Sequence, residues 1–226
     1  MLRKIFKKLE PLLLELYLRL NYSSIPNLRS DRDIEYSWIL ANLPLGPGKA
    51  LDFGCGKSYL ALAAARKDFE TIAIDLMSVS WFYIYPKLTF IKKDIFDLEL
   101  PPKSLDIIIN CSSIEHVGLA GRYGIKKSAS NRDIEVMAIM KKLLKPGGKM
   151  LLTIPVGQDA LFSSSHRVYG RERLPKLLDG YIVEKKEYWI KDEQNRWILT
   201  NESDALNLVP NSDFYGLGCF VLKKKI

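Results

Sequence analysis

The sequence predicts an α/β fold in which helices cover a mostly parallel sheet. A short apolar segment, Ala50–Phe53, runs into Gly54-Cys55-Gly56, and an apolar stretch with helical character follows from Tyr59 to Ala65. A β-branched run at 71–75 and an apolar run at 105–109 add two further buried strands. A strand, a glycine turn and a helix form the opening of a nucleotide-binding α/β unit, so we expect a ligand at the carboxyl ends of the strands.

Composition limits the class of protein. The chain has 226 residues and is 47% hydrophobic, enough for one domain with a substantial core. Its three cysteines are far apart and lack companions at metal-ligand spacing, which predicts free buried thiols, no metal site and a reducing, cytoplasmic location. No apolar run approaches the ~20 residues that span a bilayer. The formal net charge of +8 favours anionic partners without choosing among them.

The start of the chain predicts a helical appendage or lid over residues 1–44, ahead of a sheet domain at 45–226. Residues 2–20 alternate basic and apolar positions. A basic amphipathic helix of this kind can lie in a membrane interface or pack across the domain, and both interpretations stay open. From Asp31, which can cap it, we expect a second helix with one apolar face (Ile34, Trp38, Ala41) and with Arg29, Arg32 and Asp33 toward the cleft or solvent.

The order of residues in the glycine turn distinguishes between three classes of ligand. Gly56-Lys57-Ser58 resembles the end of a P-loop, but Leu51 stands where that motif has its first glycine, so the phosphate cradle is missing. Tyr59 stands where a dinucleotide fingerprint has its third glycine, which weakens that alternative. What remains is Asp-x-Gly-x-Gly beginning at Asp52. A structural turn without a ligand also stays open.

Two more acids follow predicted strands at the same edge of the sheet. Asp75 ends the strand at 71–75, where a carboxylate can accept hydrogen bonds from both hydroxyls of a ribose. Asp94 follows the strand predicted at 88–91. Both NAD and S-adenosylmethionine (SAM) carry a ribose diol, so Asp75 supports a nucleotide site without deciding the cofactor.

The strand at 105–109 leads into Asn110-Cys111-Ser112-Ser113-Ile114-Glu115-His116-Val117-Gly118. One of the two histidines of the chain therefore lies where ligands of open α/β sheets collect. Ser113–Gly118 resembles the segment after the fourth strand of small-molecule methyltransferases. Together with Gly-Arg-Tyr-Gly at 121–124 and His166-Arg167-Val168-Tyr169, it is similar to a methyltransferase-like group, with Ala120 as an apparent extra residue.

Asp-x-Gly-x-Gly also resembles motif I of the class I SAM-dependent methyltransferases, and Asp94 resembles their motif III. This resemblance implies a Rossmann-like three-layer sandwich: a seven-stranded, mostly parallel sheet whose last strand inserts antiparallel between the fifth and sixth. It implies SAM as the cofactor, with the glycine turn around its methionine half and Asp94 on the adenine. The cofactor-binding residues would be Asp52, Gly54, Cys55, Gly56, Asp75, Leu76, Asp94, Ile95, Asn110 and Cys111.

The remainder of the chain fits this sequence of elements. A helix is predicted at 132–144, a fifth strand at 149–154 and a short helix at 171–178. The last two strands are expected at 181–190 and 215–222 as an edge pair, with a polar stretch between them.

The implied activity is methylation of a hydroxyl on a small-molecule, sugar or lipid-linked glycan acceptor. A neutral histidine is a suitable base for the hydroxyl proton. His116 is the first candidate and His166 the second, with Glu115 orienting His116 or the acceptor. The acceptor would contact Arg122, Tyr123, Arg167 and Tyr169. Two alternatives stay open: an RNA or protein methyltransferase, which the positive charge favours, and a SAM-binding module without turnover.

Overall fold

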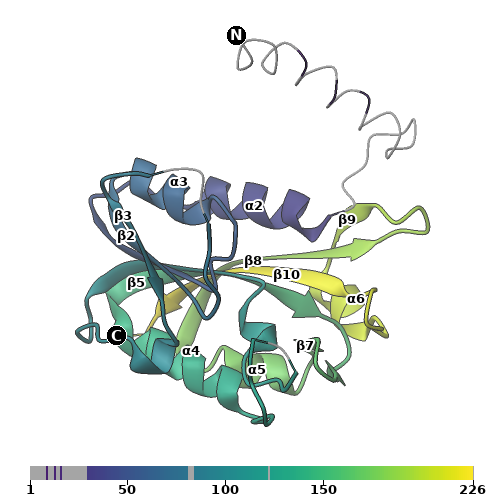
Figure 1. The fold of residues 1–226 in the computed structure, drawn as a ribbon. Coiled ribbons are helices and arrows are strands. Elements are labelled where there is room, and N and C mark those ends of the chain that lie inside the picture. The colour runs from purple at the N-terminus through teal and green to yellow at the C-terminus, as the bar shows by residue number, and fades with distance from the viewer. Residues whose placement is uncertain are drawn as a thin grey trace.

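The computed structural model describes residues 30–80, 84–121 and 123–225, together with Leu9, Leu13 and Leu16. Within that part of the chain, one sheet lies between two layers of helices. Helices α2 (Asp31–Asn42) and α3 (Leu60–Arg66) cover one face, and α4 (Arg132–Leu143) and α5 (Arg173–Leu177) cover the other (Figure 1). The predicted three-layer α/β architecture is confirmed.

The sheet has eight strands in the order β3-β2-β1-β4-β5-β10-β8-β9. Their bounds are β1 (Gly48–Phe53), β2 (Phe69–Asp75), β3 (Leu88–Lys92), β4 (Leu105–Cys111), β5 (Leu144–Val156), β8 (Tyr181–Lys191), β9 (Trp197–Thr200) and β10 (Gly216–Lys224). The first five strands pair in parallel, and β10 lies antiparallel between β5 and β8. The predicted insertion of the last strand is therefore confirmed.

The predicted pairing of the last two strands is confirmed, since β10 pairs antiparallel with β8, but the count of seven strands and the edge position of that pair are wrong. The polar stretch between the last two predicted strands contains β9, which pairs with β8 from Trp197 opposite Lys191 to Thr200 opposite Tyr188. Trp197 is buried, whereas Ile198 and Leu199 are exposed. A four-residue edge strand with one anchoring side chain has too little alternation for its pattern to stand out. The same stretch also forms the short helix α6 (Glu202–Asn207).

The central strands are buried on both faces, as parallel strands are. Within β4, Ile108 packs toward the α4 side, while Ile107 and Ile109 pack with α2 and α3. Full burial of each such side chain contributes about 1.5–3 kcal/mol relative to exposure. These strands therefore make a rigid support whose carboxyl ends share one edge. All three cysteines are buried and free, as predicted.

The N-cap of helix α2 is Ser30, one residue before the predicted cap Asp31. The Ser30 side chain accepts from the amide of Arg32, and Asp33 bonds back to the amide of Ser30. Asp31 instead accepts a hydrogen bond from the Tyr215 hydroxyl, at 2.8 Å. Ala41, predicted to face inward, is exposed.

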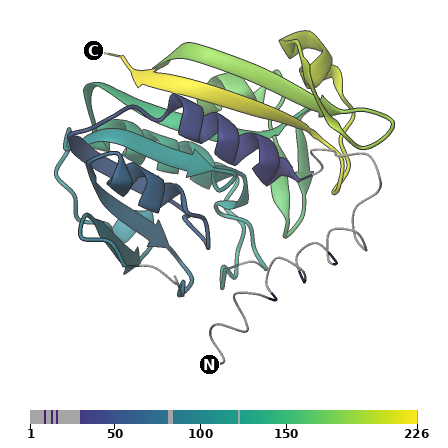
Figure 2. The same cartoon turned by 90° about the horizontal axis from the view of Figure 1, so that it is seen from above.

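Figure 2 shows α2 lying along the middle of the sheet, with α3 beside it. Trp38 and Ile39 of α2 belong to the same buried hydrophobic cluster as Leu151 of β5 and Val221 of β10. The helix is thereby held against β5, whose carboxyl end lies at the predicted ligand edge, and against β10, which begins there.

The structure does not describe Arg122 or most of residues 2–20, so the predictions for those residues lie outside the described part of the chain. They stay predictions. In the ranges that the structure describes, no helix has the length and apolar character needed to cross a membrane.

Candidate active site

Two adjoining cavities open at the carboxyl ends of β1, β2 and β4. One has a volume of about 310 Å³ and extends toward α4. The other has a volume of about 440 Å³ and extends toward α2. The wall between them is formed by residues that line both: Gly54, Asp75, Ser113, His116 and Tyr123.

The glycine turn is held in place by close packing and a hydrogen bond with Ser113. Gly54 has φ +66°, and a Cβ added there would lie 2.6 Å from Cβ of Ser113. The Ser113 hydroxyl lies 3.1 Å from the carbonyl oxygen of Gly54 and 3.1 Å from that of Cys111. Gly56 has φ +49°, and a Cβ there would meet nothing within 4 Å. The first glycine is thus required for close packing, whereas the second leaves open space in the larger cavity.

Asp52 is a buried acid in the wall of the larger cavity. Its side chain is almost inaccessible, and Oδ2 has no hydrogen-bond partner in the part of the chain that the structure describes. Burial raises the pKa of Asp52 to about 7, and the charge of Asp75 adds to this; the amide of Ala61 and the Ser58 hydroxyl act in the opposite direction. A cationic group of a ligand would match this carboxylate.

The acids after β2 and β3 both reach the smaller cavity. Asp75 accepts from the amides of Gly56 (3.0 Å) and Met77 (2.8 Å). Asp94 accepts from the amide of Phe96, at 3.1 Å, and so caps the short 3₁₀ helix η1 (Ile95–Asp97). Together with Leu76 and Ile95, they give this cavity both polar and apolar lining groups. The structure therefore brings most of the predicted cofactor residues together.

Asn110 is the exception among those residues. It is fully buried and lines neither cavity, and its amide atoms have no partner among the described residues. Its neighbour Cys111 does line the larger cavity.

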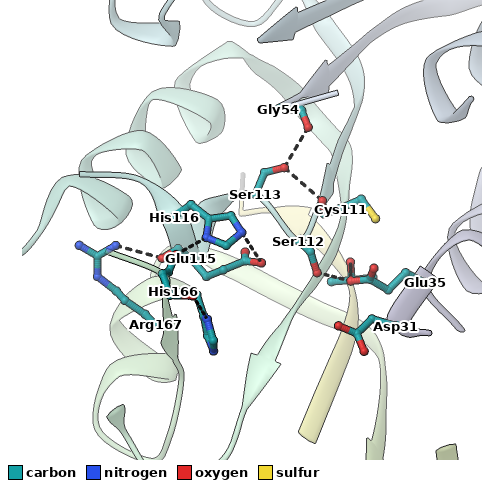
Figure 3. Close-up of polar contacts among 12 residues, drawn as sticks. Asp31, Glu35, Gly54, Cys111, Ser112, Ser113, Glu115, His116, His166 and Arg167 are labelled. Atoms are coloured by element: carbon teal, nitrogen blue, oxygen red, sulfur yellow. Dashed lines mark hydrogen bonds and ion pairs between the residues drawn. The ribbon is translucent and has the colours of Figure 1, made fainter. Parts of the chain in front are cut away.

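His116 occupies the wall between the cavities. It lies in the 3₁₀ helix η2 (Ile114–His116), and its Nδ1 is 2.6 Å from the carbonyl oxygen of Ser165 (Figure 3). A carbonyl only accepts, so Nδ1 carries the hydrogen, and Nε2 of the neutral ring is the basic nitrogen. Nε2 lies 3.6 Å from Oε1 of Glu115, whose side chain is 2% exposed. A proton taken up by Nε2 would be stabilised by that carboxylate.

The two histidine-containing motifs form one unit, although about 50 residues separate them. Arg167 donates from Nη1 to the carbonyl of Val117 (2.6 Å) and from Nη2 to that of Ala129 (3.2 Å), and Nη1 also lies 3.4 Å from the carbonyl oxygen of Glu115. Figure 3 shows this guanidinium pointing back at the Glu115 main chain. Arg167 therefore anchors the loop that carries His116.

Arg167 and Tyr169 do not reach either cavity. Tyr169 is completely buried and donates to Oδ2 of Asp133, at 3.0 Å. The contacts of both side chains are internal, so in this arrangement neither side chain contacts a ligand in either cavity.

The second histidine lies behind the first. His166 belongs to the hairpin of β6 (Ala160–Phe162) and β7 (His166–Val168), where it is buried. Its ring centroid is 5.0 Å from that of Tyr215 and 6.4 Å from that of His116. It lines neither cavity, whereas Tyr123 lines both. Of the two predicted bases, only His116 can therefore touch a ligand in this arrangement.

Helix α2 contributes a polar cluster that includes an acid absent from the sequence predictions. Glu35 is completely buried; its Oε1 accepts from Thr153 (2.8 Å) and Ser112, and its Oε2 pairs with Arg32. Arg32 and Tyr36 line the larger cavity. Burial is the main reason that the pKa of Tyr36 is raised, to about 12. The sequence feature that could have identified Glu35 is its position directly after Ile34, on the apolar side of the helix.

Comparison with known proteins identifies the family of the chain. Residues 97–213, more than half of the chain, match the family described as "Caenorhabditis protein of unknown function, DUF268". The chain belongs to this family. The match includes the loop of His116 and the hairpin of His166, but not the glycine turn. No curated protein sequence matches the chain.

Solved structures with a similar fold include SAM-dependent methyltransferases. The Burkholderia thailandensis 1,6-didemethyltoxoflavin-N1-methyltransferase, solved with its substrate and S-adenosylhomocysteine (SAH), has a TM-score of 0.60 and 13% identity over 88% of this chain and 80% of that one. A SAM-dependent methyltransferase from Archaeoglobus fulgidus has a TM-score of 0.59 and 16% identity over 87% and 96%.

A third similar structure is the Haemonchus contortus phosphoethanolamine N-methyltransferase 2, with a TM-score of 0.56 and 18% identity over 84% of this chain and 52% of that one. At these identities the likeness establishes the fold. The chain has the Rossmann-like fold of class I methyltransferases.

Proposed function

We propose that the chain is a SAM-dependent methyltransferase that acts on a hydroxyl of a small-molecule, sugar or lipid-linked glycan acceptor. The observation that carries this proposal is the position of His116. It lies in the wall shared by the two cavities, with Nδ1 held by a carbonyl and Nε2 beside the buried Glu115. A base at the junction of the two cavities would lie beside the centre of a ligand that spans both, which is where an acceptor hydroxyl has to lose its proton.

The residues of the two cavities fit the two halves of SAM. The smaller cavity offers Asp75 and Asp94 between the apolar Leu76 and Ile95, which suits a ribose and an adenine. The larger cavity offers the unpaired oxygen of Asp52 and the open space at Gly56, which suits a cationic amino-acid group beside main chain. SAM, when bound, supplies a methyl group activated by its sulfonium.

The chain itself would align the acceptor and remove its proton. Nε2 of His116 would take up the hydroxyl proton, and the Glu115 carboxylate would stabilise the imidazolium. Alignment in the cavity is a large term, because well-oriented groups react as though at effective concentrations of about 10⁵ M or more. The Burkholderia and Haemonchus proteins bear names of small-molecule methyltransferases, which supports an acceptor of that size.

Ligand binding tests the cofactor before any acceptor is known. Thermal-shift titration with SAM, SAH and NAD should show stabilisation by the first two; a ligand at about 100 times its Kd adds about 2.7 kcal/mol. Stabilisation by NAD alone would exclude the proposal.

The base is tested with isotopically labelled SAM and fractionated pools of small molecules and glycans. The amide of His116→Asn can still donate to the Ser165 carbonyl but provides no basic nitrogen, so we expect unchanged SAH binding and a loss of turnover of about 10²–10⁴-fold. His166→Asn is the matched control and should retain most turnover. A few-fold loss in His116→Asn would remove His116 as the base.

The same assay addresses the alternatives. Label appearing in RNA or protein but in no small molecule would favour those acceptors, and binding of RNA should then weaken steeply with salt. SAM binding without transfer to any pool would indicate a binding module.

A further inference from the structure

Helix α2 presents Arg32 to the larger cavity, and part of its guanidinium makes no hydrogen bond among the described residues. Nη1 of Arg32 pairs with Oε2 of Glu35 and lies 3.4 Å from Sγ of Cys111. Its side chain is 46% exposed, and it lines the cavity. Among the described residues, neither Nε nor Nη2 has a hydrogen-bond partner. An arginine with two free donors facing a cavity is suited to a planar anion such as a carboxylate.

Glu35 fixes the direction of this arginine. Its carboxylate is completely buried, and both oxygens are occupied, Oε1 by Ser112 and Thr153 and Oε2 by Arg32. Figure 3 shows Glu35 reaching from α2 to Ser112 at the end of β4. A buried, saturated carboxylate does not itself bind a ligand. It ties Arg32 to the sheet edge that carries the cavity.

The larger cavity therefore presents groups of opposite sign. Asp52 lines it with one carboxylate oxygen that has no partner among the described residues, and Arg32 lines it with unused donors. A zwitterionic α-amino acid group carries an ammonium and a carboxylate, one for each. Lys57 also lines the cavity, but its side chain is exposed and no hydrogen bond or ion pair among the described residues fixes its position.

We propose that Arg32 binds the carboxylate at the amino-acid end of the cofactor, opposite Asp52, and that Glu35 is its positioning residue. This inference rests on the proposed function, since it assigns a contact in the same site. It makes α2, which lies outside the glycine-turn and strand-end markers, part of the cofactor site.

Paired ligands isolate the carboxylate. SAH carries the amino-acid group, and 5′-methylthioadenosine has the same adenosine and thioether without it. Titration calorimetry with both ligands should therefore separate a lost carboxylate contact from a damaged cavity. Arg32→Lys keeps a counter-charge for Glu35 but loses the planar fork. The double variant Arg32→Gln/Glu35→Gln removes both charges and keeps the shape and the Ser112 and Thr153 bonds.

We expect SAH to bind about tenfold more weakly to Arg32→Lys and about tenfold to hundredfold more weakly to the double variant. Binding of 5′-methylthioadenosine should stay within about twofold of the wild type in both. Glu35→Gln alone, which loosens the position of Arg32, should give an intermediate loss for SAH. Arg66→Gln, at an exposed position of α3 that lines neither cavity, is the control and should change SAH binding less than about threefold.

Wild-type affinity for SAH in the two Arg32 variants would overturn this inference and leave the proposed function standing. Equal losses for both ligands would also overturn it, because the effect would then lie in the cavity as a whole. Failure of the wild type to bind either ligand would instead refute the proposed function, and this inference with it.

Discussion

Asp52→Asn should make the ligand-free protein more stable at neutral and alkaline pH. Burial raises the pKa of Asp52 from its ordinary value of 3.8 to about 7. Between those values the folded state holds a proton that the unfolded state has released, so the unfolding free energy falls as pH rises through this window. Asparagine has no proton to lose. The advantage of the variant should therefore grow across the same interval.

The magnitude follows from the width of the window. A rise from 3.8 to about 7, at about 1.36 kcal/mol for each unit, gives an upper limit of about 4 kcal/mol. Relaxation of the turn and loss of one accepted hydrogen bond reduce this, so we expect about 2–4 kcal/mol in favour of Asp52→Asn at about pH 8. At about pH 4 both proteins carry a neutral group, and the difference should fall to within about 1 kcal/mol.

Urea denaturation of both proteins at several pH values between about 4 and 8 measures this directly. The slope of the unfolding free energy against pH should be less negative in the variant. A variant that is less stable than the wild type by the same amount at every pH would refute the reasoning. It would mean that the Asp52 carboxylate is already ionised and well solvated or paired in the folded state.

Three further outcomes follow from the same geometry. SAH binding to the wild type should release protons between about pH 5 and 7, because a ligand ammonium beside Asp52 favours its ionised form; calorimetry in buffers of different ionisation enthalpy measures this, and Asp52→Asn should show less release. Gly54→Ala should lower the unfolding free energy by about 1–3 kcal/mol, because φ +66° is strained for alanine and its Cβ would collide with Ser113; equal urea midpoints would contradict this. Arg167→Lys should lower the unfolding free energy by about 2–4 kcal/mol, because the guanidinium that donates to the main-chain carbonyls of the His116 loop is lost. Arg171→Lys, at an exposed site, is the control and should change the unfolding free energy by less than about 0.5 kcal/mol.

The edge of the sheet at which the site lies could be predicted from the sequence because the carboxyl ends of parallel strands share one edge. Acids placed at or near the carboxyl ends of three predicted strands had to come together there once those segments formed parallel strands. Asp52, Asp75 and Asp94 do line the cavities. His116 follows for the same reason, since it lies five residues after the end of β4.

Which groups each buried polar side chain contacts in the folded protein could not be predicted in the same way. An arginine next to a histidine favours a surface site, yet Arg167 is buried because the carbonyls it serves belong to a loop about 50 residues earlier. Glu35 would be expected in solvent, and only the position of Ser112 and Thr153 makes its burial tolerable. Such contacts depend on long-range packing, which residue spacing does not encode.

The oxygen that holds Nδ1 of His116 belongs to the main chain of Ser165, and every amino acid carries that oxygen. Exchanging the side chain at this position can therefore leave the orientation of the imidazole intact. Adding or removing one residue in the turn between β6 and β7 would displace the carbonyl and rotate the ring. Related proteins must keep the length of this hairpin if their histidine is to be oriented in the same way. A comparison of residue identities at position 165 would not reveal this requirement.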